Sequence, residues 1–264
     1  ALARAWSGGL GGGVAWGTES CRRAWRCLQL TSRAVADISA AVPVAGPNAR
    51  AVVSALFPSI PLDTASFPFL AVRDAELKGF PVRLHRITFS GELAYELWTP
   101  NWYGLALWES VIEAGEPLGI TPYGTEAMHV LRAEKGYIIV GQETDGTVTP
   151  QDLGMGWIVS KKKEFIGKRS FRRADTSRPD RRHLVGLFPV DGNELLPEGA
   201  QLSLESRTDP PIAMVGYVTS SYRSTTLGRT FALALVERGR ERIGENVFAP
   251  MPERLIAATV NEPI

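Results

Sequence analysis

The chain has 264 residues, of which 44% are hydrophobic and 22% are charged, and its formal net charge is +1. This is ordinary globular usage, and the near-zero charge argues against nucleic acid or an acidic membrane as a partner. No run of about 18 apolar residues occurs, so no membrane span is predicted.

Residues 1–33 are rich in Gly, Arg, Trp and Ala and follow no clear period. The glycine run at residues 8–13 lacks a preceding strand and the Gly-Lys-Ser/Thr of a phosphate loop, which predicts an irregular segment. A signal peptide is not indicated, because the basic start and apolar centre are missing. Cys21 and Cys27 are too few for a disulfide framework or a zinc site, which favours a reducing, cytoplasmic setting.

Residues 34–178 are predicted to form a mixed domain of helices and strands. A strand at 36–47 ends at a Gly-Pro turn, and Asn48 is the expected N-cap of a helix at 49–57 that Pro58 stops. Residues 80–89 and 93–98 predict a strand pair around Ser90 and Gly91.

Two further helices are predicted, at residues 102–114 and 123–135. The first carries an apolar stripe at helical spacing, which we expect to be its buried face. The stripe consists of Leu105, Trp108, Val111 and Ile112. Met128, Leu131 and Arg132 lie near one face of the second.

Residues 179–264 are predicted to form a separate β-rich domain. The polar, proline-bearing run at 172–182 has the composition of a linker. Short β-like runs follow, several of them separated by Gly or Pro turns, and indicate a small antiparallel barrel or sandwich. The runs are residues 183–188, 201–204, 214–219, 230–235 and 255–260.

The stretch FSGELAYEL at residues 89–97 is the strongest candidate for a binding site. Successive side chains of a strand alternate between its faces, so Glu92, Ala94 and Glu96 are expected on one face and Leu93 and Tyr95 on the other. Two carboxylates beside a small alanine suit the floor of a pocket for a donor-rich ligand. The alternative is the solvated edge of an ordinary amphipathic strand.

Other catalytic signals are weak. His85, His129 and His183 are far apart in sequence, and we expect each to be structural or exposed. Neither a Gly-x-Ser-x-Gly elbow, nor metal-ligand spacing, nor a dinucleotide fingerprint after a strand occurs. The residues alone therefore predict an α+β protein with a β-rich C-terminal domain and an acid-floored pocket.

The 89–97 stretch resembles the Thr/Ser-Gly-Glu-x-Gly-Tyr-Glu signature of the folate-binding aminomethyltransferase family, which includes the glycine-cleavage T-protein. Further family motifs occur on both sides of this stretch in the expected order, and the resemblance runs from about residue 34 onward. They are VAGPNAR at 44–50, LRAEKGY at 131–137, FIGK at 165–168, and MVGYVTS at 214–220 with STTLGR at 224–229. The resemblance is closest to the sarcosine oxidase α-subunit and dimethylglycine-oxidising branch. It implies a folate-binding aminomethyltransferase-like domain followed by a small antiparallel β-barrel.

The resemblance also implies roles for individual residues. Glu96 matches the glutamate that binds the pterin edge of tetrahydrofolate, and Glu92 is expected to assist it unless it serves the turn. Tyr137 matches an aromatic residue that packs on the folate, with an ordinary core tyrosine as the alternative. Arg132 matches an arginine near the folate; the alternative is a structural ion pair with Glu134 or another acid. Phe89 stands where a relative has a pocket tyrosine, so a contact from that hydroxyl is missing.

The family's catalytic aspartate is expected well upstream of the VAGPNAR turn, before Ala1 by this alignment. Asp37 lies too close to that turn to be its equivalent, so the catalytic residue is unknown. Residues 1–30 do not resemble the family. We therefore expect a C-terminal piece of a larger enzyme or a copy with a replaced N-terminus, with weakened or absent catalysis in this chain by itself.

Three functions remain open from the sequence. The first is the tetrahydrofolate-binding portion of a sarcosine oxidase α-like enzyme that forms methylenetetrahydrofolate, with any flavin or NAD in other domains or subunits of an amine oxidase complex. The second is a stand-alone folate-dependent aminomethyltransferase or demethylase. The third is a non-catalytic folate-fold assembly protein. A metal, a nucleic acid or a membrane is not expected as a partner, and the expected location is cytoplasmic.

Overall fold

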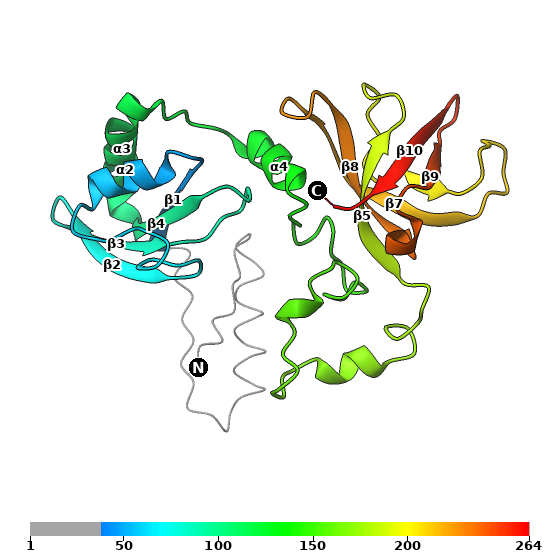
Figure 1. The fold of residues 1–264 in the computed structure, drawn as a ribbon, viewed down its shortest axis with the longest axis horizontal. Coiled ribbons are helices and arrows are strands. Elements are labelled where there is room, and N and C mark those ends of the chain that lie inside the picture. The colour runs from blue at the N-terminus through cyan, green and yellow to red at the C-terminus, as the bar shows by residue number, and fades with distance from the viewer. Residues whose placement is uncertain (1–37, 264) are drawn as a thin grey trace. The chain divides into compact units, whose positions relative to one another are not determined.

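The computed structural model describes residues 38–263 of the chain (Figure 1). Residues 1–33, which the sequence predicts to be irregular, lie outside these residues, as do the glycine run, both cysteines and Asp37. The described residues form two compact units. One consists of residues 38–88 and 92–122, and the other of residues 89–91 and 123–263.

The first unit is a four-stranded antiparallel sheet with the order β1-β4-β3-β2. Helices α2 and α3 lie together on one of its faces (Figure 1). The strands are β1 (Ser39–Ala45), β2 (Val72–Leu77), β3 (Phe80–His85) and β4 (Ala94–Pro100), and the helices are α2 (Ala49–Leu56) and α3 (Gly104–Gly115).

Strict alternation of side chains separates a core face of this sheet from an open face. Tyr95 and Leu97 on β4 are fully buried, and their register partners Val44 and Val42 on β1 are buried beside them. The ring of Tyr95 stacks on Phe67 with the centroids 6.0 Å apart. The predicted alternation of side chains is therefore present in β4. It points the side chain of Glu96, which lies between Tyr95 and Leu97, away from the helices.

The predicted strand pair is confirmed, since β3 pairs with β4 in antiparallel register. Strand β2 was not predicted, because its sequence VRDAEL is charged and mostly exposed, as is usual for an edge strand. Asn48 is the N-cap residue of α2, as predicted, but its side chain makes no capping hydrogen bond. Its backbone is helical rather than extended, and its side-chain amide donates to the carbonyl of Leu118 at 3.2 Å.

Helix α3 is rotated relative to the predicted stripe, of which Val111 is buried as expected. Leu107 and Val111 are buried, whereas Leu105 is 69% exposed and Trp108 is 42% exposed. Apolar side chains occur on most sides of this helix, so the period alone does not select the inner face. The inner face is selected by the close approach of α3 to β1 at Gly104. A Cβ atom at this position would lie 2.9 Å from the Cβ of Ala40.

The second unit is a closed antiparallel barrel with the strand order β10-β5-β8-β7-β6-β9, preceded by helix α4 and a long loop segment. The predicted barrel is thus confirmed. The helix is α4 (Thr125–Glu134), and the strands are β5 (Arg182–Pro189), β6 (Gln201–Ser203), β7 (Met214–Ser224), β8 (Arg229–Glu237), β9 (Asn246–Pro250) and β10 (Leu255–Asn261). Strand β9 was not predicted, since it is short and ends in proline.

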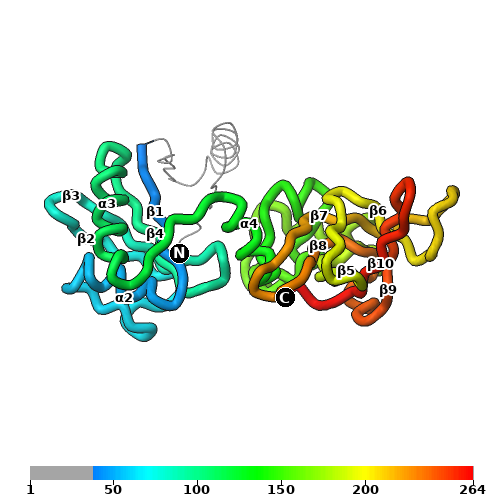
Figure 2. Tube along the Cα trace, turned by 90° about the horizontal axis from the view of Figure 1, so that it is seen from above, coloured from blue at the N-terminus to red at the C-terminus, as the bar shows by residue number. Residues whose placement is uncertain are grey.

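Apolar side chains fill the inside of the barrel and also cover part of its outside. Val185, Val218 and Val236 belong to the inner core. Tyr222 and Leu233 point outward and form a second core with Ala133 of α4. Helix α4 accordingly lies beside β7 (Figure 2).

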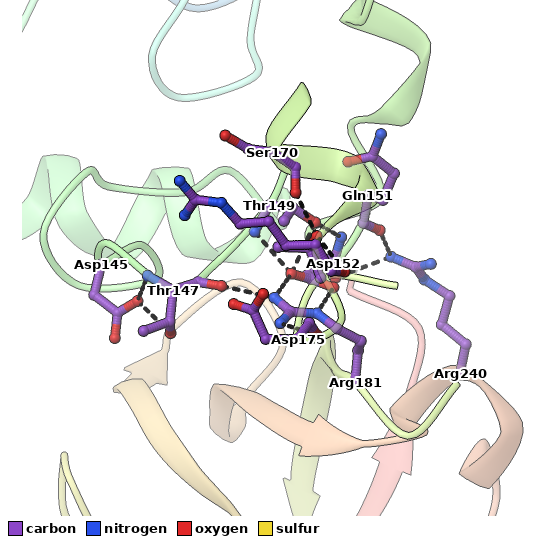
Figure 3. A network of polar contacts seen from close by, with 11 residues as sticks. Asp145, Thr147, Thr149, Gln151, Asp152, Ser170, Asp175, Arg181 and Arg240 are labelled. Carbon is purple, nitrogen blue, oxygen red and sulfur yellow. Dashed lines mark hydrogen bonds and ion pairs between the residues drawn. The ribbon is translucent and has the colours of Figure 1, made fainter. Parts of the chain in front are cut away.

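A polar network ties the loop segment between α4 and the barrel to the first barrel strand (Figure 3). The carboxylate of Asp152 accepts bonds from the backbone N–H and the hydroxyl of Thr149 at 2.7 and 2.8 Å. Arg181 forms an ion pair with the same carboxylate, and its guanidinium also donates to the carbonyl of Thr147 at 2.7 Å. Arg240 donates to the carbonyl of Asp152 at 2.9 Å. The network holds the loop segment in place against the barrel.

The rotation of α3 yields a first prediction. Leu107→Ala should reduce the free energy of unfolding by about 2–5 kcal/mol, because it leaves a cavity in the core. Leu105→Ala should change it by less than about 0.5 kcal/mol. Urea denaturation of the two variants measures the difference. A larger loss for Leu105→Ala would mean that the apolar stripe, and not the observed face, is buried.

The Asp152 network yields a second prediction. Burial raises the pKa of this carboxyl, but the bonds from Arg181 and Thr149 outweigh it and hold the pKa below its ordinary value. The stability that it contributes is present above the unfolded-state pKa and is lost as the pH falls through the lowered pKa. Asp152→Asn should therefore cost about 3–5 kcal/mol at neutral pH and progressively less in acid.

The exposed pair of Arg178 and Asp180 provides the control, since Asp180→Asn removes a carboxylate of the same unit from a solvated setting. Its cost should be much smaller. Equal losses for Asp152→Asn and Asp180→Asn in urea denaturation would contradict a structural role for the network.

Candidate functional site

Glu96 lies on the open face of the sheet, opposite α2 and α3. Its register partners are Pro43 on β1 and His85 on β3. Trp98, two residues further along β4, shares this face, and its indole N–H donates to Glu96 Oε2 at 3.0 Å. The rings of His85 and Trp98 lie 5.8 Å apart. A half-buried carboxylate is thus bordered by aromatic rings on a rigid strand.

The setting of this carboxylate disfavours its charge. Burial raises the pKa of Glu96 above its ordinary value, and the bond from Trp98 offsets this only in part. The partner that donates to the Glu96 carboxylate is the neutral indole of Trp98. An ionised carboxylate offers about four acceptor positions. Glu96 therefore retains acceptor capacity for a ligand with parallel N–H donors.

Glu92 lies outside the strand that carries Glu96. Strand β4 begins at Ala94, so the alternation does not extend back to Glu92, which is exposed. Phe89 is half-buried and belongs to the second compact unit with Ser90 and Gly91. The expected pair of carboxylates on one strand face is wrong, because the chain bends over residues 90–93 before the strand starts.

Tyr137 stands just beyond the end of α4. Gly136 adopts a positive φ of 66°, which only glycine takes without strain, and it reverses the chain there. The N–H of Tyr137 then donates to the carbonyl of Arg132 at 2.9 Å. Tyr137 is 40% exposed. It is therefore not an ordinary core tyrosine, and its ring is accessible on the surface of the second unit.

Arg132 is fully buried and ion-paired. Its Nη1 lies 3.0 Å from Oε2 of Glu143, which is also fully buried. The same nitrogen donates to the carbonyl of Tyr137 at 2.9 Å, and Nη2 donates to Gln142 at 3.1 Å. Glu134, which the sequence offers as a partner, instead accepts a bond from Ser224. An ion pair is thus present, and its acid is Glu143.

The residues predicted to bind folate are divided between the two compact units. Glu92 and Glu96 belong to the first unit, and Phe89, Arg132 and Tyr137 to the second. Their assignment to one ligand stays a prediction. Sequence reasoning missed Trp98, although the alternation that places Glu96 on the open face also places Trp98 there. It missed Glu143 as well, for which no local pattern gives a signal.

Two negative findings apply to the described residues. Among residues 38–263, His, Cys, Asp and Glu side chains do not gather in threes in a way that would hold a metal ion. In the same part of the chain, every helix is too short or too polar to cross a membrane.

Comparison with known families assigns both parts of the chain. The family model described as the GCVT N-terminal domain matches residues 14–163, and the glycine cleavage T-protein C-terminal barrel domain matches residues 182–264. The likeness therefore starts at residue 14, upstream of the motifs, and the expectation that residues 1–30 do not resemble the family is revised. The predicted domain boundary at 178/179 falls between the two matches and stays a prediction.

Individual relatives fall into two groups. Sarcosine oxidase subunit alpha of Corynebacterium sp. (strain P-1) is 49% identical over 97% of this chain, which spans 27% of that protein. Aminomethyltransferase of Halothermothrix orenii is 31% identical over 85% of this chain, which spans 60% of that protein. The chain thus covers only about a quarter of the length of the sarcosine oxidase subunit that it resembles.

A solved structure shares the fold. Aminomethyltransferase T of the glycine cleavage system from Bartonella henselae superposes with a TM-score of 0.69 and 24% identity, over 85% of this chain and 58% of that one. This confirms the predicted fold of an aminomethyltransferase-like domain followed by a barrel.

The burial of Glu96 yields a third prediction. Because its pKa is raised on folding, the stability linked to this group is fully present below the unfolded-state pKa and is lost as the pH rises through the raised pKa. Glu96→Gln keeps an acceptor for Trp98 and removes the charge. It should stabilise the protein at neutral pH by up to about 1 kcal/mol, and the gain should vanish in acid.

Urea denaturation across this pH range provides the measurement, and Glu109→Gln on the exposed side of α3 is the matched control. The control should show little pH-dependent gain. If Glu96→Gln instead destabilises the protein at neutral pH, the carboxylate has a compensating partner and its charge is not strained.

Proposed function

This chain belongs to the glycine cleavage T-protein family, and we propose that it is the tetrahydrofolate-binding portion of a sarcosine oxidase α-subunit-like enzyme. In this role it accepts a one-carbon unit, derived from an oxidised N-methyl amine, on tetrahydrofolate to give methylenetetrahydrofolate. The likeness to sarcosine oxidase subunit alpha, at 49% identity over 97% of the chain, supports this choice within the family.

The setting of Glu96 is the single observation that carries the proposal. A pterin ring presents a ring N–H and an exocyclic amine side by side, and a carboxylate accepts both, in the same two-pronged manner as it accepts arginine. The half-buried carboxylate of Glu96, with its raised pKa, gains most from such donors because they restore the solvation that it lacks. A ligand without the donors leaves the charge unpaired and is rejected.

Trp98 contributes orientation to this contact. Its indole N–H holds Oε2 of Glu96 at 3.0 Å, so the carboxylate is fixed before a ligand arrives. Its large ring shares the open face and offers a surface beside the acceptor. Pre-organised acceptors lose less conformational entropy on binding than flexible ones.

Tyr137 and Arg132 are the folate-binding residues proposed in the second unit, and they contribute in different ways. Tyr137 is the exposed aromatic residue suited to packing on a flat ring. Arg132 is fully buried, and its Nη1 and Nη2 groups are engaged with Glu143, Gln142 and the backbone of Tyr137. Its contribution is therefore to hold the Tyr137 segment in place.

Other parts of the enzyme are proposed to supply the remaining chemistry. Amine oxidation requires a redox cofactor, and flavin and NAD are assigned to other domains or subunits of an amine oxidase complex. This fits the observation that the chain spans 27% of the sarcosine oxidase subunit that it resembles. Those subunits or domains are then its partners.

A folate-dependent aminomethyltransferase is the second candidate. The likeness to the Halothermothrix orenii aminomethyltransferase covers 85% of this chain, and the fold is shared with an aminomethyltransferase of known structure. The sarcosine oxidase proposal takes precedence because its relative is 49% identical and the aminomethyltransferase 31%. An assay of the assembled complex with sarcosine separates the two candidates. Only the sarcosine oxidase proposal expects the one-carbon unit released from sarcosine to be captured by tetrahydrofolate.

Calorimetric titration with tetrahydrofolate provides the fourth prediction. The wild-type chain should bind, and Glu96→Gln should weaken binding by about tenfold or more, because its amide N–H₂ would face the donors of the pterin edge. Glu92→Gln, which changes an exposed carboxylate before β4, should bind as the wild type does. Affinity should also fall as the pH drops through the raised pKa of Glu96.

Two outcomes would contradict the proposal. Absence of binding by the wild-type chain would remove folate as its ligand and would favour a non-catalytic assembly role. Equal binding by wild type and Glu96→Gln would remove Glu96 from the contact with the pterin ring.

A further inference from the structure

A change of register in β7 brings polar side chains of the barrel to face α4. Val218 points into the barrel core, but the pairing with β8 shifts between Val218 and Ser220, which leaves Thr219 as an extra residue. Such a bulge reverses which residues of a strand face outward. Beyond it, Ser220, Tyr222 and Ser224 point out of the barrel and contact residues of α4.

Ser220 connects the two charges of the buried ion pair. Its hydroxyl lies 2.5 Å from Oε1 of Glu143 and 2.7 Å from Nη2 of Arg132. A guanidinium can only donate and an ionised carboxylate can only accept, so the hydroxyl donates to Glu143 and accepts from Arg132. Its single proton is thus committed, and the serine holds both partners in one orientation.

Glu143 is satisfied by three donors from different parts of the chain. Oε2 accepts from Arg132 Nη1 at 3.0 Å and from the backbone N–H of Ile139 at 2.8 Å, and Oε1 accepts from Ser220. The hydroxyl of Tyr222 lies 3.3 Å from Arg132 Nη2 and adds a weaker contact. Arg132, Glu143 and Ser220 are fully buried, so loss of one member leaves a charge without its full set of partners.

The cluster formed by Arg132, Glu143, Ser220 and Tyr222 also binds the backbone next to the exposed Tyr137. Arg132 Nη1 donates to the carbonyl of Tyr137 while Glu143 holds the N–H of Ile139, two residues further on. The backbone on either side of Ile138 is therefore fixed by the ion pair, and the ion pair is fixed by the barrel. A shift in Ser220 is transmitted to Tyr137 through two hydrogen bonds.

We propose that Glu143, Ser220 and Tyr222 are positioning residues of the folate site, through which the C-terminal barrel sets the place of Tyr137. They act on Arg132, and Arg132 acts on the Tyr137 backbone. This inference rests on the proposed function, because it takes tetrahydrofolate as the ligand of that tyrosine. It gives the barrel a part in ligand affinity as well as in folding.

The test uses a matched pair of serines on β7. Ser220→Ala removes the hydroxyl that connects Arg132 and Glu143. Ser224→Ala is the control, because Ser224 is also buried, donates to a carboxylate of α4 (Glu134, 2.6 Å) and accepts a backbone N–H, but does not contact Arg132. Both variants should lose stability in urea. Only Ser220→Ala should weaken tetrahydrofolate binding, by about tenfold in the folded protein.

Tyr222→Phe is the milder second variant, for use if Ser220→Ala does not fold. It removes a single 3.3 Å contact and should weaken binding by about two- to threefold. Amide hydrogen exchange of residues 137–143 provides a readout that is independent of folate. Exchange there should be faster in Ser220→Ala, or in Tyr222→Phe, than in Ser224→Ala.

The outcomes separate this inference from the proposed function. If the wild type binds and both serine variants bind equally well, the positioning role is wrong and the cluster is only structural. If the wild type does not bind tetrahydrofolate, the proposed function fails, and with it the link to folate. Faster exchange confined to the Ser220 and Tyr222 variants would still support positioning of the Tyr137 segment, and unchanged exchange would overturn it.

Discussion

The buried ion pair between Arg132 and Glu143 is the constraint on which the second unit of this protein depends. Two opposite charges, each fully out of water, are stable together only when nearly every donor and acceptor around them is engaged. The groups that bond to Arg132 and Glu143 come from the loop after α4 and from barrel strand β7, and Arg132 itself lies at the end of α4. The conformation of these three elements is therefore coupled, and none can move without exposing a charge to an apolar setting.

This coupling explains why the barrel has a core on its outside. Helix α4 is short and largely polar, and its apolar side chains are too few to bury it alone. Tyr222 and Leu233 provide an apolar outer surface for Ala133, and the bulge in β7 places Ser220 where the ion pair needs a hydroxyl. Apolar packing and the hydrogen bonds of the ion pair thus favour the same arrangement of α4 and β7, as expected when native interactions support one another.

The two faces of the sheet in the first unit carry different kinds of side chains. Tyr95 and Leu97 bury one face against helices, while Glu96 and Trp98 occupy the other. Substitution on the open face should therefore cost little in folding. The strained carboxylate of Glu96 is consistent with this division, because a site built only for stability would not retain a half-buried charge next to a neutral donor.

The sequence by itself determined the family, the antiparallel barrel and the strand that carries Glu96. Each of these follows from local periods, turn residues or motifs whose chemistry is contained in a few neighbouring positions. Tertiary structure alone decided the rotation of α3, the start of β4 after Glu92 and the partner of Arg132. Those outcomes depend on contacts between distant segments, such as Gly104 with Ala40 and Arg132 with Ser220, and burial of a charge is decided by what surrounds it in space rather than along the chain.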